Sequence, residues 1–211
     1  MIKENMADFD ENTRDRHLKE LVQLAYRLGA SNAGLVSARD IRVEDNLAAL
    51  CLKPRCEHYG LSPGCPPHVS GPAAFRRWLE KCSHAIAIRI VVPSSVLFSD
   101  ERREVMQLLH EIVAGIEQAA VDRGYTDSKA FAGGSCKHIF CRAHADCRVL
   151  SENGSCRNPQ SARPSMSGFG IHVAGLMALA GWPAETGSRN TAADPDPISW
   201  VAGLIVISET L

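Results

Sequence analysis

Cysteines are the residues of this chain most able to do chemistry, and four of its eight fall within one short stretch. The stretch "GGSCKHIFCRAHADCRVLSENGSCRNP" (133–159) contains Cys136, Cys141, Cys147 and Cys156. Thiolates are soft ligands, and four of them can close either a tetrahedral zinc site or an iron–sulfur cluster. The neighbouring glycines let the backbone curl, so that the sulfur atoms can converge. The group therefore predicts a metal site.

A second group lies in an earlier Pro- and Gly-rich segment, "CLKPRCEHYGLSPGCPPH", which contains Cys51, Cys56 and Cys65. We call residues 51–71 the first loop and residues 133–160 the second loop. Gaps of four and eight residues between cysteines occur in both loops, which suggests that both bind the same kind of group. The first loop shows only three thiols, whereas a cubane cluster needs about four ligands.

The fourth ligand of the first loop is open in the sequence. Candidates are Cys82, His58, His68 and Glu57. Cys82 also fits a core position on the inner face of a helix, and the other three fit solvated loop positions. Alternatively, one iron stays open to a small ligand, as Lewis-acid chemistry requires, or the two loops exchange ligands as in two-cluster ferredoxins.

The spacing of the second loop favours iron–sulfur without excluding zinc. Structural zinc usually takes two short cysteine pairs, each with about two to four residues between them. Gaps of five and eight residues do not form a second short pair. Iron–sulfur clusters accept scattered thiolates, and a Cys-Pro step such as Cys65–Pro66 is common at the end of a ferredoxin motif.

Composition limits the classes of partner and the compartment. The net charge of −1 and the lack of a basic tract argue against nucleic acid and anionic membranes. The polar N-terminal segment does not resemble a secretory signal, and no apolar run is long enough for a membrane span. We therefore expect a cytoplasmic protein, in which reduced thiols bind metal rather than form disulfides.

Hydrophobic periodicity predicts how the two loops are positioned. Helices are expected at 11–29, 41–50, 72–82, 99–124 and 164–181, the last one interrupted around Gly168 and Gly170. Strands are expected at 32–38, 84–92, 127–134 and 199–207, and a polar loop at 183–197. The alternation predicts a single α/β domain over 1–211, with a mixed, partly parallel sheet, helices packed on it and the two cysteine loops attached.

Charged residues flank the second loop. Arg157, Arg163 and Ser165 lie at an expected helix N-terminus, where they could bind an anion, balance the charge of a cluster or cap the helix. His138 and His144 lie inside the loop and are expected to be exposed rather than to act as ligands.

Three blocks of sequence resemble a known family. "CLKPRCEHYGLSPGCPPH", "GGSCKHIFC" and "CRNPQSARPSMSGFGIHV" are similar to the cysteine motifs of the prokaryotic predicted metal-binding proteins called domain of unknown function 2284. The blocks keep their order over most of residues 50–180. Relatives often carry another cysteine in the helix after Cys-Pro-Pro, where this chain has Phe75.

The resemblance implies a cytoplasmic, iron–sulfur-binding protein without an assigned reaction. We expect two [4Fe–4S] clusters, one held by the four cysteines of the second loop and one by the three of the first loop plus a further ligand, with a redox partner protein or a small-molecule substrate. A structural-zinc interaction module and an enzyme with an open iron in the first loop are the alternatives. The sequence decides neither catalysis nor the oligomeric state.

Overall fold

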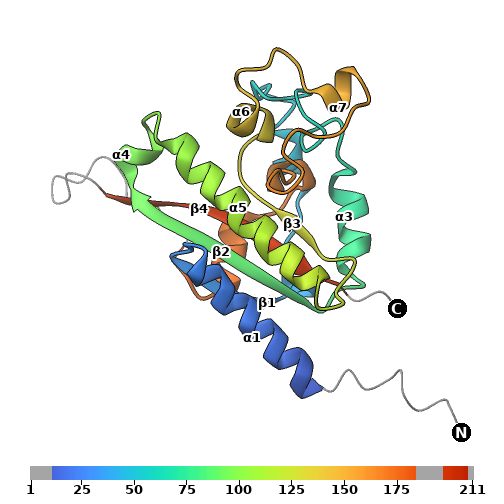
Figure 1. Cartoon of the computed structure of the whole chain (residues 1–211), viewed down its shortest axis with the longest axis vertical. Helices are drawn as coiled ribbons and strands as arrows, with labels where there is room; N and C mark the ends of the chain where they lie inside the picture. The colour runs from blue at the N-terminus through green and yellow to red at the C-terminus, as the bar shows by residue number, and fades with distance from the viewer. Residues whose placement is uncertain (1–10, 184–196, 209–211) are drawn as a thin grey trace, which may run out of the picture.

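The computed structural model describes residues 11–183 and 197–208, in which four strands form one sheet (Figure 1). Across the sheet the strands are β1 (Asn32–Ser37), β2 (His84–Pro93), β4 (Ile198–Ile207) and β3 (Lys129–Phe131). The helices are α1 (Glu11–Arg27), α2 (Asp45–Ala49), α3 (Gly71–Leu79), α4 (Ser94–Leu97), α5 (Arg102–Val121), α6 (Cys136–Phe140), α7 (Arg148–Ser151) and α8 (Val173–Leu179), with short 3₁₀ turns η1 (Ala38–Asp40) and η2 (Met166–Phe169).

Helices cover both faces of the sheet, which explains why its central strands are almost continuously apolar. Successive side chains of a strand point to opposite faces. In β2, Ile86 and Ile88 pack with the buried residues of α1 and α5, whereas Ala85 and Ala87 pack with those of α3, η2 and α8. The expectation of an α/β structure with helices packed on a sheet is therefore confirmed.

The expected partly parallel sheet is wrong, because every neighbouring pair of strands is antiparallel. β4 is antiparallel to both β2 and β3, so β2 and β3 run in the same direction but are not neighbours. The last strand of the chain thus lies between two strands that a helix connects. Alternation of helices and strands predicts that β2 and β3 run in the same direction. It cannot predict that β4 lies between them.

Most of the expected elements are present, with changed ends. The helix expected at 41–50 is reduced to α2, and the one expected at 164–181 is divided into η2 and α8 at Gly170, as predicted. Gly170 has φ +69°, and a Cβ there would meet the Glu44 carbonyl oxygen, so only glycine fits this close approach. α4 was not expected, and the loop expected at 183–197 lies almost wholly outside the described residues.

Both cysteine loops lie at one end of the sheet, beside the start of α5 (Figure 1). The backbone ties the first loop to the segment that follows the second loop, because the Ser165 amide donates to the Gly64 carbonyl over 2.9 Å. A Cβ on Gly64 would lie 3.0 Å from the Pro164 Cα, so glycine permits this contact. No helix in the described ranges has the length and apolar character of a membrane span.

Candidate metal centre

Two cavities lie at this end of the molecule, and each contains the cysteines of one loop. Cys51, Cys56 and Cys65 line the first-loop cavity, which has a volume of about 340 Å³. Cys136, Cys141, Cys147 and Cys156 line the second-loop cavity, of about 380 Å³. All eight cysteines of the chain are free thiols. The two sets predicted from sequence spacing are thus each brought to one cavity.

Short helices position the four thiols of the second-loop cavity. Cys136 is the first residue of α6, and Cys147 directly precedes α7. The Cys141 amide closes α6 by donating to the Lys137 carbonyl over 3.1 Å, which turns Cys141 back toward the cavity. Cys136, Cys141 and Cys147 therefore each sit where a short helix begins or ends.

Asn158 places two N–H groups on sulfur in this cavity. Its backbone amide donates to Cys156 Sγ over 3.3 Å, and its side-chain amide donates to Cys141 Sγ over 3.4 Å. Hydrogen bonds to sulfur stabilise the negative charge of a thiolate ligand and tune a cluster. Asn158 is a site residue that spacing arguments missed, although it stands two positions after Cys156.

Burial and neighbouring thiolates make the thiol of Cys136 difficult to ionise without a cation. Burial raises the pKa of Cys136 to about 11, although the nearby Ser62 hydroxyl opposes part of the rise. Repulsion from the thiolates of Cys65, Cys156 and Cys147 adds to the increase. Cys136 therefore favours the neutral thiol when no cation is beside it, and metal binding would release its proton.

Ser62 provides a test of whether the residues fit a thiolate-bound group. Its side chain is fully buried, and its oxygen has no partner with regular hydrogen-bond geometry. It nevertheless lies close enough to Cys136 to favour the thiolate form. A buried hydroxyl without a partner is unfavourable, whereas a hydroxyl beside a metal-bound thiolate has an acceptor. Ser62 therefore fits a charged sulfur at this position.

In the first-loop cavity, one backbone turn joins two of the three cysteines. The Cys56 amide donates to the Cys51 carbonyl over 3.1 Å, which brings these cysteines to the same side of the loop. Burial raises the pKa of Cys51, and the thiolates of Cys56 and Cys65 raise it further. Cys65 is buried, and its thiol donates to the Ser135 hydroxyl over 3.5 Å.

The candidates for a fourth ligand of the first loop are placed differently. His58 and Glu57 line the first-loop cavity, and His138 of α6 joins them there with its ring centroid 4.9 Å from that of His58. Burial lowers the pKa of His58, against the opposing effect of Glu57. His68 lies outside this lining and contacts the Gly60 carbonyl instead.

Cys82 lies apart from both cavities. It is 1% exposed and belongs to the hydrophobic cluster of α3, η2 and α8. Its thiol donates to the Trp78 carbonyl over 3.4 Å. Phe75 packs in the same cluster against Phe131 and Phe169. Both residues therefore contribute to the core in this structure.

One thin wall separates the two cavities. In each of three neighbouring pairs, one residue lines the first-loop cavity and the other lines the second-loop cavity: Cys65 and Gly64, Ser135 and Cys136, Arg142 and Cys141. Cys65 is also near enough to Cys136 to raise its pKa after the larger effect of burial. Groups bound in the two cavities would be neighbours.

α5 holds both ends of the second loop through His110 and Glu117. His110 is fully buried, and its Nε2 contacts the Gly133 carbonyl over 3.0 Å while its Nδ1 accepts from the Arg163 amide over 3.1 Å. The Glu117 carboxylate accepts from Arg163 Nε over 2.5 Å and from the Ala130 amide over 2.6 Å. Arg163 therefore anchors the loop rather than facing an anion.

The other polar residues in and beside the second loop lie in different places. Arg157 lines the second-loop cavity and donates to the Asp146 carbonyl over 3.3 Å. Ser165 precedes η2 and lines the first-loop cavity. His144 is exposed, as expected, and its carbonyl accepts from the Lys137 ammonium over 2.6 Å. None of the three pairs with a carboxylate among the described residues.

The thiols surround space rather than a single point. Within residues 11–183 and 197–208, no three His, Cys, Asp or Glu side chains converge closely enough to hold one metal ion. The second-loop cavity of about 380 Å³ is many times larger than the roughly 10–15 Å³ that one water molecule needs. The four cysteines of the second loop thus line one cavity without forming a closed site for a single metal ion.

Comparisons with known proteins give one match. The model of a family described as "Predicted metal-binding protein (DUF2284)" matches residues 34–206, which include both cysteine loops and all four strands except the ends of β1 and β4. No curated protein and no solved structure gives a significant match.

Proposed function

Because this chain belongs to the family of predicted metal-binding proteins called domain of unknown function 2284, we propose that it is an iron–sulfur protein with two [4Fe–4S] clusters. The family description supports metal binding and leaves the metal open. The observation that carries the proposal is the second-loop cavity, where four free cysteines surround one volume. Four thiolates are the usual ligand set of such a cluster.

Cys136, Cys141, Cys147 and Cys156 would hold the cluster of the second loop. A bound cluster supplies one-electron chemistry, and the protein sets its potential through burial and hydrogen bonds to sulfur. Asn158 donates to two of these sulfur atoms, and Ser62 lies beside a third. These contacts support a negatively charged ligand set, because each favours a thiolate over a thiol.

Cys51, Cys56 and Cys65 would hold the cluster of the first loop with one position left for another ligand. His58 and His138 line the same cavity and are candidates for this position, and a small molecule is the alternative. Cys82 would not take part, because it is buried in the core below α3.

Two clusters separated by the thin wall at Cys65 and Cys136 would exchange electrons readily. We propose that the protein passes these electrons between a redox partner protein and a substrate in the first-loop cavity. A reducing cytoplasm, in a prokaryotic cell, is the compartment in which exposed cysteine loops keep their thiols available for clusters.

Purification without oxygen tests the proposal against a structural-zinc module. We expect a brown protein whose broad absorption in the visible blue bleaches on reduction with dithionite. A colourless protein that contains stoichiometric zinc and does not respond to dithionite would instead support a structural role.

A further inference from the structure

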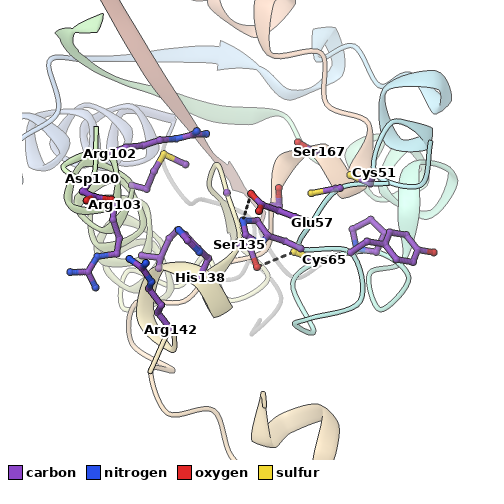
Figure 2. A pocket seen from close by; sticks show the side chains of 18 of the residues that line it. Cys51, Glu57, Cys65, Asp100, Arg102, Arg103, Ser135, His138, Arg142 and Ser167 are labelled. Atoms are coloured by element: carbon purple, nitrogen blue, oxygen red, sulfur yellow. Dashed lines mark hydrogen bonds and ion pairs between the residues drawn. The ribbon is translucent and has the colours of Figure 1, made fainter. Parts of the chain in front are cut away.

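The first-loop cavity has two walls of different chemistry. Figure 2 shows Cys51 and Cys65 on one side, Arg102, Arg103 and Arg142 on the other, and His138 between them. Arg102 and Arg103 come from the start of α5, and Arg142 lies two residues beyond the end of α6, so the fold brings distant parts of the chain to this side of the cavity. This side of the cavity is not needed to hold the thiols.

The three guanidinium groups have no carboxylate partner in the described part of the chain. Two acidic residues, Asp100 and Glu57, also line the cavity, but neither forms an ion pair with these arginines. The Glu57 side chain is 84% exposed, and its contact is with His58. This side of the cavity therefore carries three exposed guanidinium groups without an ion pair among the described residues, although Asp100 and Glu57 lie in the same lining.

The remaining lining suits a small organic molecule. The volume of about 340 Å³ lies in the range of about 300–1,000 Å³ typical of ligand pockets. Met106 and Ile139 provide apolar surface, and Ser99, Ser135 and Ser167 provide hydroxyl groups. A mixed lining of this kind binds a molecule with both an apolar part and polar groups.

We propose that the first-loop cavity binds a small organic anion, with a carboxylate or phosphate group held by Arg102, Arg103 and Arg142 opposite the three cysteines. Arginine forks bind both kinds of group through paired N–H donors. The first turn of α5 adds the positive end of its helix dipole to the same side. This inference deepens the proposed function, since it names the substrate class, but the binding itself needs only the arginines.

Calorimetric titration of the anaerobically purified, full-length protein tests this site. The probes are citrate for carboxylates and inorganic pyrophosphate for phosphates, and we expect a dissociation constant below about 1 mM for at least one of them. The stronger probe identifies the anionic group. The triple variant Arg102→Gln, Arg103→Gln, Arg142→Gln should weaken that binding about tenfold or more, because it removes charge-assisted hydrogen bonds.

Arg39→Gln is the matched control, because Arg39 is exposed on η1 and lines neither cavity. Its binding should equal that of the unchanged protein. Where the triple variant is unstable, the three single variants replace it, each with a smaller loss. The inference is overturned if neither anion binds more tightly than about 1 mM, or if the arginine variants bind as well as the control.

The visible spectrum of the same samples separates this inference from the proposed function. A colourless protein that binds an anion through the arginines would refute the iron–sulfur proposal and support the anion site. A brown protein that binds neither probe would refute the anion site alone.

Discussion

At the scale of single residues, the site depends on how buried thiols become charged. Burial and neighbouring thiolates raise the pKa of Cys51, and burial is also the main cause at Cys136, whose pKa reaches about 11. This environment favours the neutral thiol, and a bound cation would favour the thiolate. Asn158, Ser62 and Ser135 contact the sulfur atoms, which is the environment a thiolate needs.

Removing one ligand of the second loop should remove one cluster. For Cys147→Ala we expect the iron content to fall from about eight to about four atoms per chain, since a cubane loses its fourth ligand. Colorimetric iron analysis of the anaerobically purified variant measures this. An unchanged iron content would contradict the assignment of Cys147.

Cys82→Ala is the control for that loss, because it changes a cysteine of the core instead. We expect the iron content to stay the same and the free energy of unfolding to fall by about 1 kcal/mol, as for a small buried group. Iron analysis and urea unfolding measure the two effects. A loss of iron would instead make Cys82 the missing fourth ligand.

At the scale of elements, α5 supports the second loop. His110 binds Gly133 at one end of the loop and Arg163 at the other, and Glu117 holds Arg163 as well. The amphipathic pattern predicted this helix, and α5 confirms it with ends a few residues inside the expected range. The pattern could not show that His110, on the buried face, serves as an anchor, because core histidines and anchoring histidines have the same sequence context.

Titration of His110 should make the free energy of unfolding depend on pH. Burial lowers the pKa of His110 to about 4, so the folded protein keeps this ring neutral while the unfolded chain protonates it below about 6.5. The folded state therefore loses stability as the pH falls from about 6.5 to about 4. The loss should total about 3 kcal/mol over that window.

His110→Gln should remove this dependence. We expect the variant to be less stable than the unchanged protein at pH 7.5 by about 1–2 kcal/mol, because its amide replaces the ring hydrogen bonds imperfectly. Its stability should then fall less steeply as the pH is lowered. Urea unfolding followed by circular dichroism at several pH values, on samples of equal iron content, measures both effects. Equal slopes for the two proteins would refute the role of His110.

At the scale of the whole molecule, the fold puts two cysteine cavities side by side. The sequence located the strands, the long helices and both loops, because hydrophobic period and turn residues are local signals. It failed on strand direction, because insertion of β4 between β2 and β3 is a long-range event. For the same reason it missed the arginine side of the first-loop cavity, where α5 and α6 meet. The grouping of seven cysteines into two sets followed from their spacing.

Ser135, in the wall between the cavities, should tune the cluster of the first loop. Its hydroxyl contacts Cys65 Sγ, and the next residue is Cys136 of the other cavity. If Cys65 is a thiolate ligand, the hydroxyl donates to it and raises the reduction potential of the first-loop cluster. Ser135→Ala should lower that potential by about 40 mV, the one-electron equivalent of a hydrogen bond of about 1 kcal/mol.

Redox titration followed by electron paramagnetic resonance measures this shift. In Ser135→Ala, the reduction potential of the second-loop cluster should change little, and the iron content should stay the same. Ser167→Ala is the control, because Ser167 lines the same cavity without a hydrogen bond to sulfur among the described residues. Equal potentials in the unchanged protein and in Ser135→Ala would rule out this contact as a tuning device.

Counting iron and acid-labile sulfide in the anaerobically purified protein tests the central claim most directly. Two cubane clusters predict about eight iron atoms and about eight sulfide ions per chain, and no stoichiometric zinc. Zinc bound at one or two atoms per chain without labile sulfide, or thiols that carry no metal after anaerobic purification, would contradict the account.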